Sequence, residues 1–205
     1  DQPGFEDRAW APAQSIALDS RPLVWLRNEP IRVVQELKPI QLTEPKPGVY
    51  VFDLGQNMVG WCRIDAIGAA GQTVTIRHAE MLNDDGTLYT ANLRAAPQVN
   101  RYTPRETGRF VFEPRFTYQG FRYVELTGLA QPPTPQAILG RVFHSTSPVV
   151  GRFECSDASL NQLMRNILWT QRANLMSSPN DCPQRDERLG WMGDIQVFAQ
   201  TAMFN

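Results

Sequence analysis

The chain has 205 residues, a formal net charge of −1, 42% hydrophobic residues and 20% charged residues. This balance supplies a normal globular core and excludes a disordered chain. The near-neutral charge gives no electrostatic reason to bind nucleic acid or an anionic membrane, and no apolar run approaches the roughly 20 residues that span a bilayer. Cys62, Cys155 and Cys182 do not form a disulfide framework. Their sparse number favours the cytoplasm, with the periplasm and secretion left open.

The first 25 residues are irregular and include the stretch DRAWAPA with an isolated Trp10. A segment of this length cannot bury a core of its own. We therefore interpret residues 1–25 as the end of a preceding domain. Because the sequence begins at Asp1 without a methionine, we expect it to be processed or excised, and the lack of a signal peptide says little about the intact protein.

Residues 26–150 show the short apolar stretches of β-strands. Apolar and polar residues alternate in 73–78 and 122–126, which places one face of each strand in a core and the other in solvent. The sequence DDG at 84–86 is a turn signal, and glycines separate the stretches. Many short strands without intervening helices predict a mainly β chain, with an antiparallel β-sandwich over 26–150.

The pattern changes to a helical period near Gly151. Apolar residues fall on one helical face from Leu160 to Leu175. Ser156 or Asp157 can cap the start of this helix, and Pro179 is expected to end the pattern.

A second helical pattern begins around 193–194 and includes Ile195, Phe198 and Met203. Two helices cannot cover each other and the edge of a sandwich as well. We therefore expect residues 151–205 to form an incomplete helical domain with exposed apolar faces. Such faces favour aggregation or homo-oligomerisation.

The densest chemical segment is DCPQRDERLGWMGD, residues 181–194, which combines four carboxylates, two arginines and a tryptophan. Cleavage of a glycosidic bond needs one carboxylic acid to protonate the leaving oxygen and one carboxylate to activate water. Neighbouring carboxylates and an apolar wall raise the pKa of a Glu, whereas arginines lower it. The segment fits a sugar-cleaving site, and it also fits a solvated domain junction in which Arg and Asp pair for structure.

Other chemistries have weaker support in the sequence. The only histidines, His78 and His144, lack ligand spacing with Cys182, so we expect no metal site. A nucleophilic Cys182 would need a nearby histidine. There is no glycine-rich phosphate loop, and we expect no cofactor.

Several other polar and aromatic residues have structural interpretations. We expect Asp53, Gln56 and Asn57, in the turn-like sequence DLGQN, to fix the sandwich turns. We expect His78 and Glu80 to form a core polar pair or an interdomain contact. Tryptophans that we expect in a core or an interface are Trp25, Trp61 and Trp169.

The segment DCPQRDERLGWMGD resembles the signature of the α-L-rhamnosidases of glycoside hydrolase family 78. The stretches YVFDLGQNMVGWCRI, RHAEMLNDDGTLYTANLR and FTYQGFRYVELTG are similar to that family's β-sandwich domain. Residues 151–191 resemble the start of its (α/α)6 barrel, and DRAWAPA is similar to the last strand of its preceding jelly-roll domain. The resemblance implies a jelly-roll tail at 1–25, a β-sandwich at 26–150 and the first helices of a truncated barrel at 151–205.

The resemblance also implies roles for individual residues. Glu187 matches the general acid of the family. Asp181, Arg185 and Asp194 match residues that hold rhamnose hydroxyls, and Trp191 matches an aromatic wall of the pocket.

The family inverts at the anomeric carbon, so the acid and the base should stand roughly 6.5–9.5 Å apart. The family's base is a Glu far downstream, beyond residue 205. Asp186 and Asp194 do not replace it, since family members carry both besides the distant Glu. We therefore expect this chain to lack the base and to be inactive, or nearly so, when isolated.

The resulting hypothesis is a glycoside hydrolase segment that takes part in inverting release of terminal α-L-rhamnose from rhamnose-containing glycosides. Two alternatives stay open. The chain could be a non-catalytic carbohydrate-binding or scaffold module, or part of a related (α/α)6 glycosidase with another sugar specificity.

Overall fold

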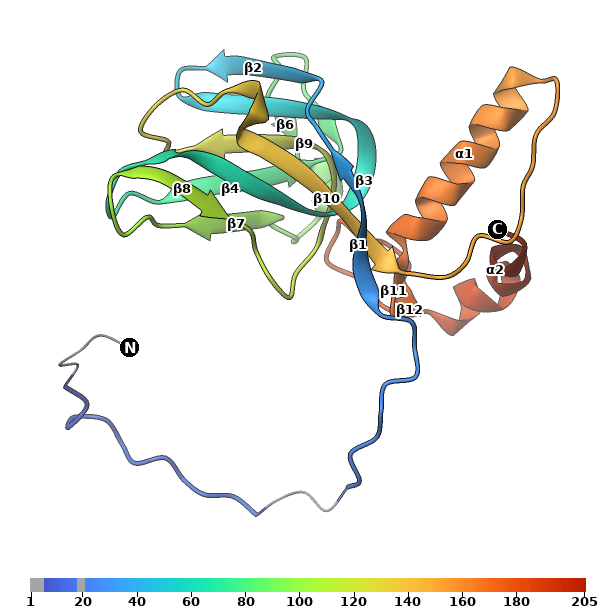
Figure 1. Cartoon of the computed structure of the whole chain (residues 1–205), viewed down its shortest axis with the longest axis horizontal. Helices are drawn as coiled ribbons and strands as arrows, with labels where there is room; N and C mark the ends of the chain where they lie inside the picture. The colour runs from blue at the N-terminus through green and yellow to red at the C-terminus, as the bar shows by residue number, and fades with distance from the viewer. Residues whose placement is uncertain (1–5, 18–20) are drawn as a thin grey trace.

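The computed structural model describes residues 6–17 and 21–205. A β-sandwich forms one end of the molecule, and two α-helices lie beyond the ends of its strands (Figure 1). Within the described residues, none of the helices is long and apolar enough to cross a membrane. Residues 6–17 and 21–30 contain turns and extended chain but no strand.

The sandwich strands all lie between residues 31 and 145. Their bounds are β1 Ile31–Leu37, β2 Gln41–Lys46, β3 Val49–Gly68, β4 Val74–Ala79, β5 Met81–Leu82, β6 Leu88–Tyr89, β7 Val99–Tyr102, β8 Gly108–Phe112, β9 Gln119–Thr127 and β10 Ile138–Ser145. Two short 3-10 helices, η1 Ala91–Leu93 and η2 Pro135–Ala137, interrupt the loops. The predicted antiparallel β-sandwich is confirmed.

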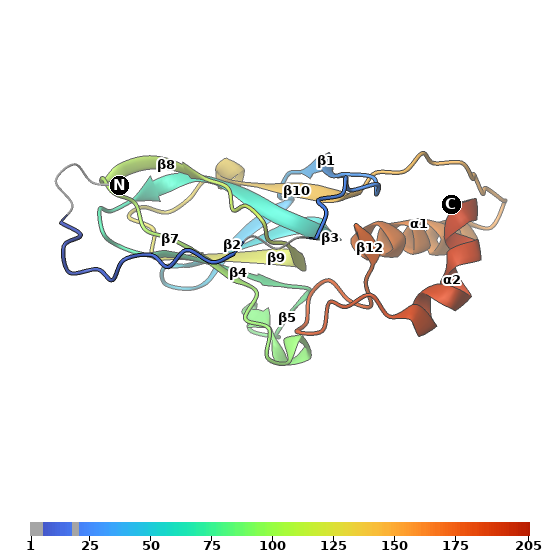
Figure 2. The same ribbon diagram turned by 90° about the horizontal axis from the view of Figure 1, so that it is seen from below.

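Strand β3 belongs to both layers of the sandwich. Its first part pairs with β2 and β9, and its last part pairs with β10 and β8. One layer therefore runs β2-β3-β9-β4-β7 and the other β1-β10-β3-β8, as the edge-on view shows (Figure 2). All these pairings are antiparallel, which fits the alternating apolar pattern of the sequence.

The sequence DLGQN, whose polar residues we expect to fix a sandwich turn, does not form a turn between strands. It lies inside β3, where the register against β9 shifts between Asp53 and Met58. The left-handed backbone at Gly55, with φ 73°, accommodates this bulge. The Asp53 carboxylate accepts a hydrogen bond from the Gly55 backbone N–H at 2.6 Å and pairs with Arg122 across the sheet at 2.7 Å. Asp53 is structural, as expected, but it shapes a bulge, whereas Gln56 is half-buried and Asn57 is exposed and donates to Glu80.

The sandwich core lies between the two layers. Phe52, Ile64, Phe121, Val124 and Leu126 are fully buried there. Burying an aromatic or a branched aliphatic side chain of this size contributes about 1.5–3 kcal/mol. The core therefore holds β3, β9 and β10 in fixed positions. Helix α1 (Ala158–Ala173) and strand β11 (Leu175–Met176) contact β3 and β10, and the segment after β12 (Ser178–Pro179) contacts β9 at Gly120.

The first helix, α1 Ala158–Ala173, begins where the sequence predicts. Asp157 is its N-cap, and its carboxylate accepts hydrogen bonds from the backbone N–H groups of Ser159 and Leu160. The helix ends at Ala173, with Asn174 as its C-cap, so the expected end at Pro179 is wrong. The chain instead makes a small hairpin of β11 Leu175–Met176 and β12 Ser178–Pro179.

The second helix, α2 Met192–Phe204, begins one residue before the predicted 193–194. The large apolar residues exposed on it are Met192, Val197, Met203 and Phe204. The predicted exposure of apolar residues on this helix is confirmed at Met203, whereas Ile195 and Phe198, which we also expect to be exposed, are half-buried.

A hydrophobic cluster joins the sandwich to the helical part. Val59 and Phe143 of the sandwich are buried together with Met176 of β11. Trp61 packs against this cluster, and Trp169 of α1 packs against the main core, as expected for interface residues. The expectation for Trp25 is wrong, since its side chain is 89% exposed in a segment without neighbouring strands.

Candidate active site

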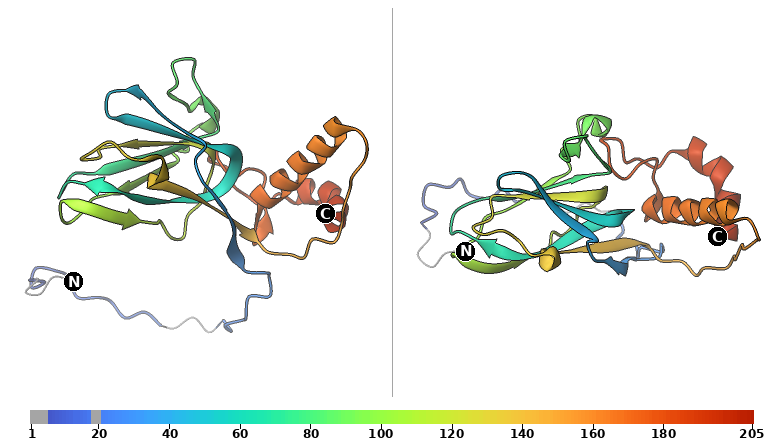
Figure 3. Two further views of the ribbon diagram at one scale, coloured as in Figure 1. Left: turned by 45° about the horizontal axis from the view of Figure 1, so that its top comes forward. Right: turned by 90° about the horizontal axis from the view of Figure 1, so that it is seen from above.

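Residues 181–194, here called the acidic strip, run from just after β12 into the first turn of α2. The strip runs beside the loop that contains η1 of the sandwich (Figure 3). Residues 181–191 are not helical; Trp191 is the N-cap position of α2 and Asp194 lies in its first turn. Glu187, Trp191 and Asp194 therefore do not share one helical face, and the loop conformation determines where each side chain lies.

Arg188 ties the acidic strip to the sandwich. Its guanidinium donates to the Tyr118 backbone carbonyl at 2.8 Å and to the Gln119 side-chain oxygen at 3.4 Å. It also donates to the carbonyls of Arg185 and Gln184 within the strip. The backbone of Arg188 itself is left-handed, with φ 51°. One side chain therefore fixes both the shape of the strip and its position.

Gly120 of β9 allows the strip to approach the sandwich closely. A Cβ atom at this position would lie 3.0 Å from the Gln184 Cβ and 3.1 Å from the Pro183 Cγ. The buried Gln98 amide donates to the Gly120 carbonyl and accepts from its N–H. Since Gly120 takes part in these bonds and has no side chain, the strip rests directly on the sheet backbone.

The Glu187 carboxylate is half-buried between two arginines. Its Oε2 accepts from Arg185 Nε at 3.0 Å and from Arg94 Nη1 at 3.2 Å. Arg185 belongs to the strip, whereas Arg94 follows η1 in the sandwich. Both contacts use the same oxygen of Glu187, so two independent parts of the fold hold its orientation.

Asp181 lies beside Glu187 and is the more buried carboxylate of the two. It accepts from the Leu189 backbone N–H at 2.8 Å and pairs with Arg185 at 3.5 Å. Burial acts to raise the pKa of Asp181, but hydrogen bonds from the Leu189 N–H, the Cys182 thiol and Glu187 outweigh it and lower the pKa. Asp181 therefore stays ionised and accepts hydrogen bonds. The neighbouring Cys182, Glu187 and Asp181 raise the pKa of the Arg185 guanidinium.

Ligand atoms of Asp181, Cys182 and Glu187 lie within 4.8 Å of one another. Such a cluster has the spacing of a metal site, but both carboxylates already face arginines. A cation would have to compete with the guanidinium of Arg185, which contacts both of them. The donor set therefore fits an ion-pair network better than a metal centre.

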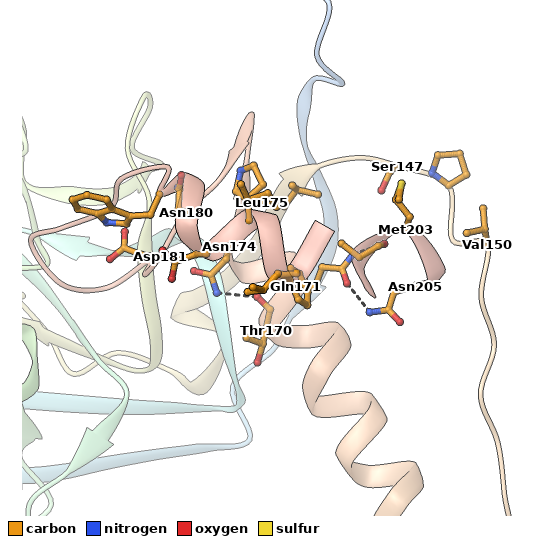
Figure 4. Close-up of a pocket in the computed structure, with 18 residues that line it drawn as sticks. Ser147, Val150, Thr170, Gln171, Asn174, Leu175, Asn180, Asp181, Met203 and Asn205 are labelled. Atoms are coloured by element: carbon orange, nitrogen blue, oxygen red, sulfur yellow. Dashed lines mark hydrogen bonds between the residues drawn. The ribbon is translucent and has the colours of Figure 1, made fainter. Parts of the chain in front are cut away.

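A cavity of about 620 Å³ lies beside the strip. Asp181, Trp191 and Asp194 line it together with residues of α1, α2 and the 147–150 segment. Figure 4 shows Asn180 and Asp181 at one end of the cavity and Met203 at the other. Aromatic, aliphatic and carboxylate groups meet here, as in small-ligand sites.

The structure brings the predicted site residues together in two groups. Asp181, Arg185 and Glu187 form the ion-pair network, and Asp181, Trp191 and Asp194 line the cavity. Asp181 belongs to both groups and connects them.

Sequence reasoning missed two arginines of this site. Arg188 lies within the recognised segment, but nothing in its spacing identifies it as the contact to Tyr118. Arg94 is separated from Glu187 by 93 positions, and no motif links them. The unusual backbone of Arg94, with φ 56°, appears only in the structure.

Comparisons with known proteins bear directly on this site. Residues 43–144 match the family model described as the bacterial alpha-L-rhamnosidase concanavalin-like domain. Residues 148–205 match that of the bacterial alpha-L-rhamnosidase 6 hairpin glycosidase domain, which includes the whole acidic strip.

Curated relatives and solved structures agree with these matches. The chain is 51% identical over 203 residues to an α-L-rhamnosidase of Streptomyces avermitilis and 42% identical over 210 residues to one of Formosa agariphila. It superposes on the S. avermitilis enzyme complexed with L-rhamnose with a TM-score of 0.86, covering 98% of this chain and 20% of that one. For the enzyme from Aspergillus terreus, the TM-score is 0.85 at 40% identity, with 98% and 23% covered.

These matches cover nearly all of the present chain and a small part of each relative. The alignments span 98% of this chain in both curated relatives, but only 20% and 22% of those proteins. The chain thus corresponds to about one fifth of a curated relative.

Proposed function

Because this chain belongs to the bacterial α-L-rhamnosidase family, we propose that it supplies the proton donor and part of the sugar pocket of a rhamnoside hydrolase. The proposed reaction is inverting hydrolysis of a terminal α-L-rhamnose. The observation that carries the proposal is the position of Glu187, held by Arg185 beside the ionised Asp181.

Glu187 is the proposed general acid. Breaking a glycosidic bond requires a proton on the leaving oxygen, and a positioned carboxylic acid supplies it. The lowered pKa of Asp181 supports its role as a charged hydrogen-bond acceptor beside Glu187.

Asp181, Arg185, Asp194 and Trp191 are the proposed rhamnose-binding residues. Carboxylates and a guanidinium hydrogen-bond sugar hydroxyls, and an indole face offers apolar surface to a sugar ring and its methyl group. The shared cavity of Asp181, Trp191 and Asp194 supports this assignment. Arg185, which contacts both Asp181 and Glu187, connects the sugar-binding and proton-donating groups.

The water-activating base is proposed to come from outside residues 1–205. An inverting enzyme needs a second carboxylate roughly 6.5–9.5 Å from the acid. Asp181 is too close to Glu187, with ligand atoms within 4.8 Å, and it accepts a backbone hydrogen bond. The chain alone should therefore bind sugar weakly and turn over little or none.

We retain the proposed division of the chain into a jelly-roll tail at 1–25, a β-sandwich at 26–150 and the start of a barrel at 151–205. The strands between 31 and 145 and the helices after 158 support the second and third parts of this division. The proposed role of the sandwich is to present β9 and the η1 loop as a rigid support for the acidic strip.

A chimera tests the proposed function. This chain would replace the aligned segment of the S. avermitilis α-L-rhamnosidase, to which it is 51% identical. The chimera should hydrolyse p-nitrophenyl α-L-rhamnopyranoside, and the isolated chain should not. Glu187→Gln should reduce turnover by the chimera, whereas the control Glu154→Gln, which removes an exposed ion pair with Arg152, should not. Robust turnover by the isolated chain that Glu187→Gln abolishes would contradict the proposal of a missing base.

Calorimetric titration with L-rhamnose separates the pocket from a non-catalytic sandwich module. Loss of binding in Trp191→Ala supports the pocket. Binding that survives Trp191→Ala and is lost on changing Tyr123, a sandwich aromatic covered by Arg122, supports the module instead.

A further inference from the structure

Arg94 is a sandwich residue whose side chain contacts Glu187 directly. Its Nη1 lies 3.2 Å from Glu187 Oε2, and the backbone N–H of the next residue, Ala95, donates to Asp186 Oδ2 at 3.3 Å. The η1 loop therefore contacts two consecutive carboxylates of the acidic strip, one through a side chain and one through the backbone.

The η1 loop is anchored on both sides of Arg94. Leu93 is 1% exposed, and the Gln98 side chain is buried against Gly120. Glu80 accepts a hydrogen bond from Asn92 at 3.0 Å, which fixes the start of the loop. Arg94 thus extends from a well-held segment of the sandwich.

The backbone of Arg94 is in an uncommon conformation. Its φ is 56° and its ψ is −120°, outside the regions that residues with a Cβ usually adopt. Backbone strain of this kind persists where surrounding contacts hold it, and it concentrates at functional sites. In this loop the strained residue is also the one whose side chain reaches Glu187.

We propose that Arg94 is a positioning residue for general-acid catalysis: the sandwich uses it to orient Glu187 and to stabilise the carboxylate formed when Glu187 gives up its proton. This inference rests on the proposed function of Glu187. It gives the β-sandwich a part in catalysis in addition to its role as a support.

The charge of Arg94 is placed for this role. When Glu187 donates its proton to the leaving oxygen, its carboxyl group becomes negative. A permanently charged guanidinium at Oε2 interacts more strongly with that carboxylate than with the neutral acid, so its stabilisation grows toward the transition state. Arg185 contacts the same oxygen but also pairs with Asp181, so its charge is shared. Among the described residues, the recorded ion pair of Arg94 is with Glu187 alone.

Leaving-group dependence in the chimera tests this proposal. Phenyl α-L-rhamnoside has a poor leaving group and needs the acid, whereas 2,4-dinitrophenyl α-L-rhamnoside does not. Arg94→Ala should lower kcat/KM for the phenyl substrate by roughly 10-fold, a fraction of the whole general-acid contribution, and change the dinitrophenyl value less than about 2-fold. Arg94→Lys keeps the charge and should restore part of the loss. Alanine and arginine disfavour the φ and ψ angles of position 94 to a similar degree, so the substitution changes the backbone strain little.

Two controls separate the possible outcomes. Arg109→Ala removes another arginine–carboxylate pair of the sandwich, with Asp65, and should leave kcat/KM unchanged for both substrates. Glu187→Gln, like Arg94→Ala, should lower kcat/KM mainly for the phenyl substrate, and the loss should be larger. Suppose that Glu187→Gln lowers kcat/KM mainly for the phenyl substrate, but Arg94→Ala lowers kcat/KM equally for both substrates or for neither. The positioning role is then wrong while the proposed function stands. If Glu187→Gln itself is not selective, the proposed function fails first.

Discussion

Arg188 of the acidic strip and Tyr118 of the sandwich are joined in two ways. The guanidinium donates to the Tyr118 backbone carbonyl at 2.8 Å, and it lies over the phenol ring with 5.1 Å between the guanidinium carbon and the ring centroid. The Tyr118 hydroxyl in turn accepts from Asn180 at 2.9 Å, just before the strip begins. This pair holds the segment that carries Glu187 on the sandwich, so the geometry of the site depends on a contact between two parts of the fold.

Replacing Arg188 should loosen the strip without unfolding the sandwich. Arg188→Ala removes four hydrogen bonds from a partly buried guanidinium, and we expect a loss of about 2 kcal/mol in the free energy of unfolding. Urea denaturation measures this loss. Arg188→Lys should recover little of it, because an ammonium cannot reproduce the planar fork of donors. Full recovery by lysine would show that charge alone matters here.

Gly120→Ala should push the strip away from the sheet. The new methyl group would lie 3.0 Å from the Gln184 Cβ, closer than ordinary packing allows, and overpacking of this kind costs about 1–3 kcal/mol. Hydrogen exchange should become faster in residues 181–190. The matched control is Gly193→Ala in the first turn of α2, where a Cβ meets nothing within 4 Å. That change should stabilise the helix by up to about 1 kcal/mol. Unchanged exchange in Gly120→Ala would show that the strip is not seated on β9 as described.

His78 should make the fold sensitive to acid. It is 1% exposed in β4, its ring lies 4.6 Å from that of Phe121, and its Nδ1 is 2.9 Å from the Gln98 carbonyl, to which the neutral ring donates. Burial lowers its pKa from 6.5 to about 4. The unfolded chain therefore binds a proton below pH 6.5 that the folded chain does not, and stability falls as the pH drops from 6.5 toward 4, by about 3 kcal/mol in total.

Denaturation at a series of pH values tests this dependence. His78→Gln should flatten the stability profile between pH 6.5 and 4, and the control His144→Gln should keep the slope of the unchanged protein. Equal slopes in the unchanged protein and His78→Gln would show that the acid sensitivity comes from other groups.

The apolar surface of α2 should make the isolated chain associate. Val197 is 77% exposed and Met203 is 70% exposed, and both line the 620 Å³ cavity beside Trp191. Exposed patches of this kind promote self-association. Size-exclusion chromatography with light scattering should show oligomers of the 205-residue chain, and Val197→Asp with Met203→Asp should shift it toward a monomer. A monodisperse monomer of the unchanged chain would contradict this prediction.

Local sequence patterns predicted much of the fold. Alternation identified the strands, and the Asp157 cap marked the start of α1 because capping depends on a few neighbouring residues. Local patterns failed where distant contacts decide the outcome. DLGQN reads as a turn, but pairing with β9 on both sides of the bulge keeps β3 continuous. Pro179 reads as a helix end, but the chain leaves the helix at Asn174 and forms a hairpin first.

The same distinction holds for the site. The acidic strip is continuous in sequence, so its resemblance to a known signature was visible there. Arg94 lies in a loop without apolar periodicity, and only the packing of η1 against the strip brings it to Glu187. A contact between residues 93 positions apart leaves no trace in one sequence.

The most direct test of the account is the leaving-group dependence of the chimera with Glu187 replaced. If Glu187 is the proton donor, Glu187→Gln should lower kcat/KM for phenyl α-L-rhamnoside by about 10²–10⁴-fold. It should leave hydrolysis of 2,4-dinitrophenyl α-L-rhamnoside within a few-fold of the unchanged chimera, because that leaving group departs without a proton. An equal loss for both substrates in a folded variant, or no loss for either, would contradict the assignment of Glu187 as the acid.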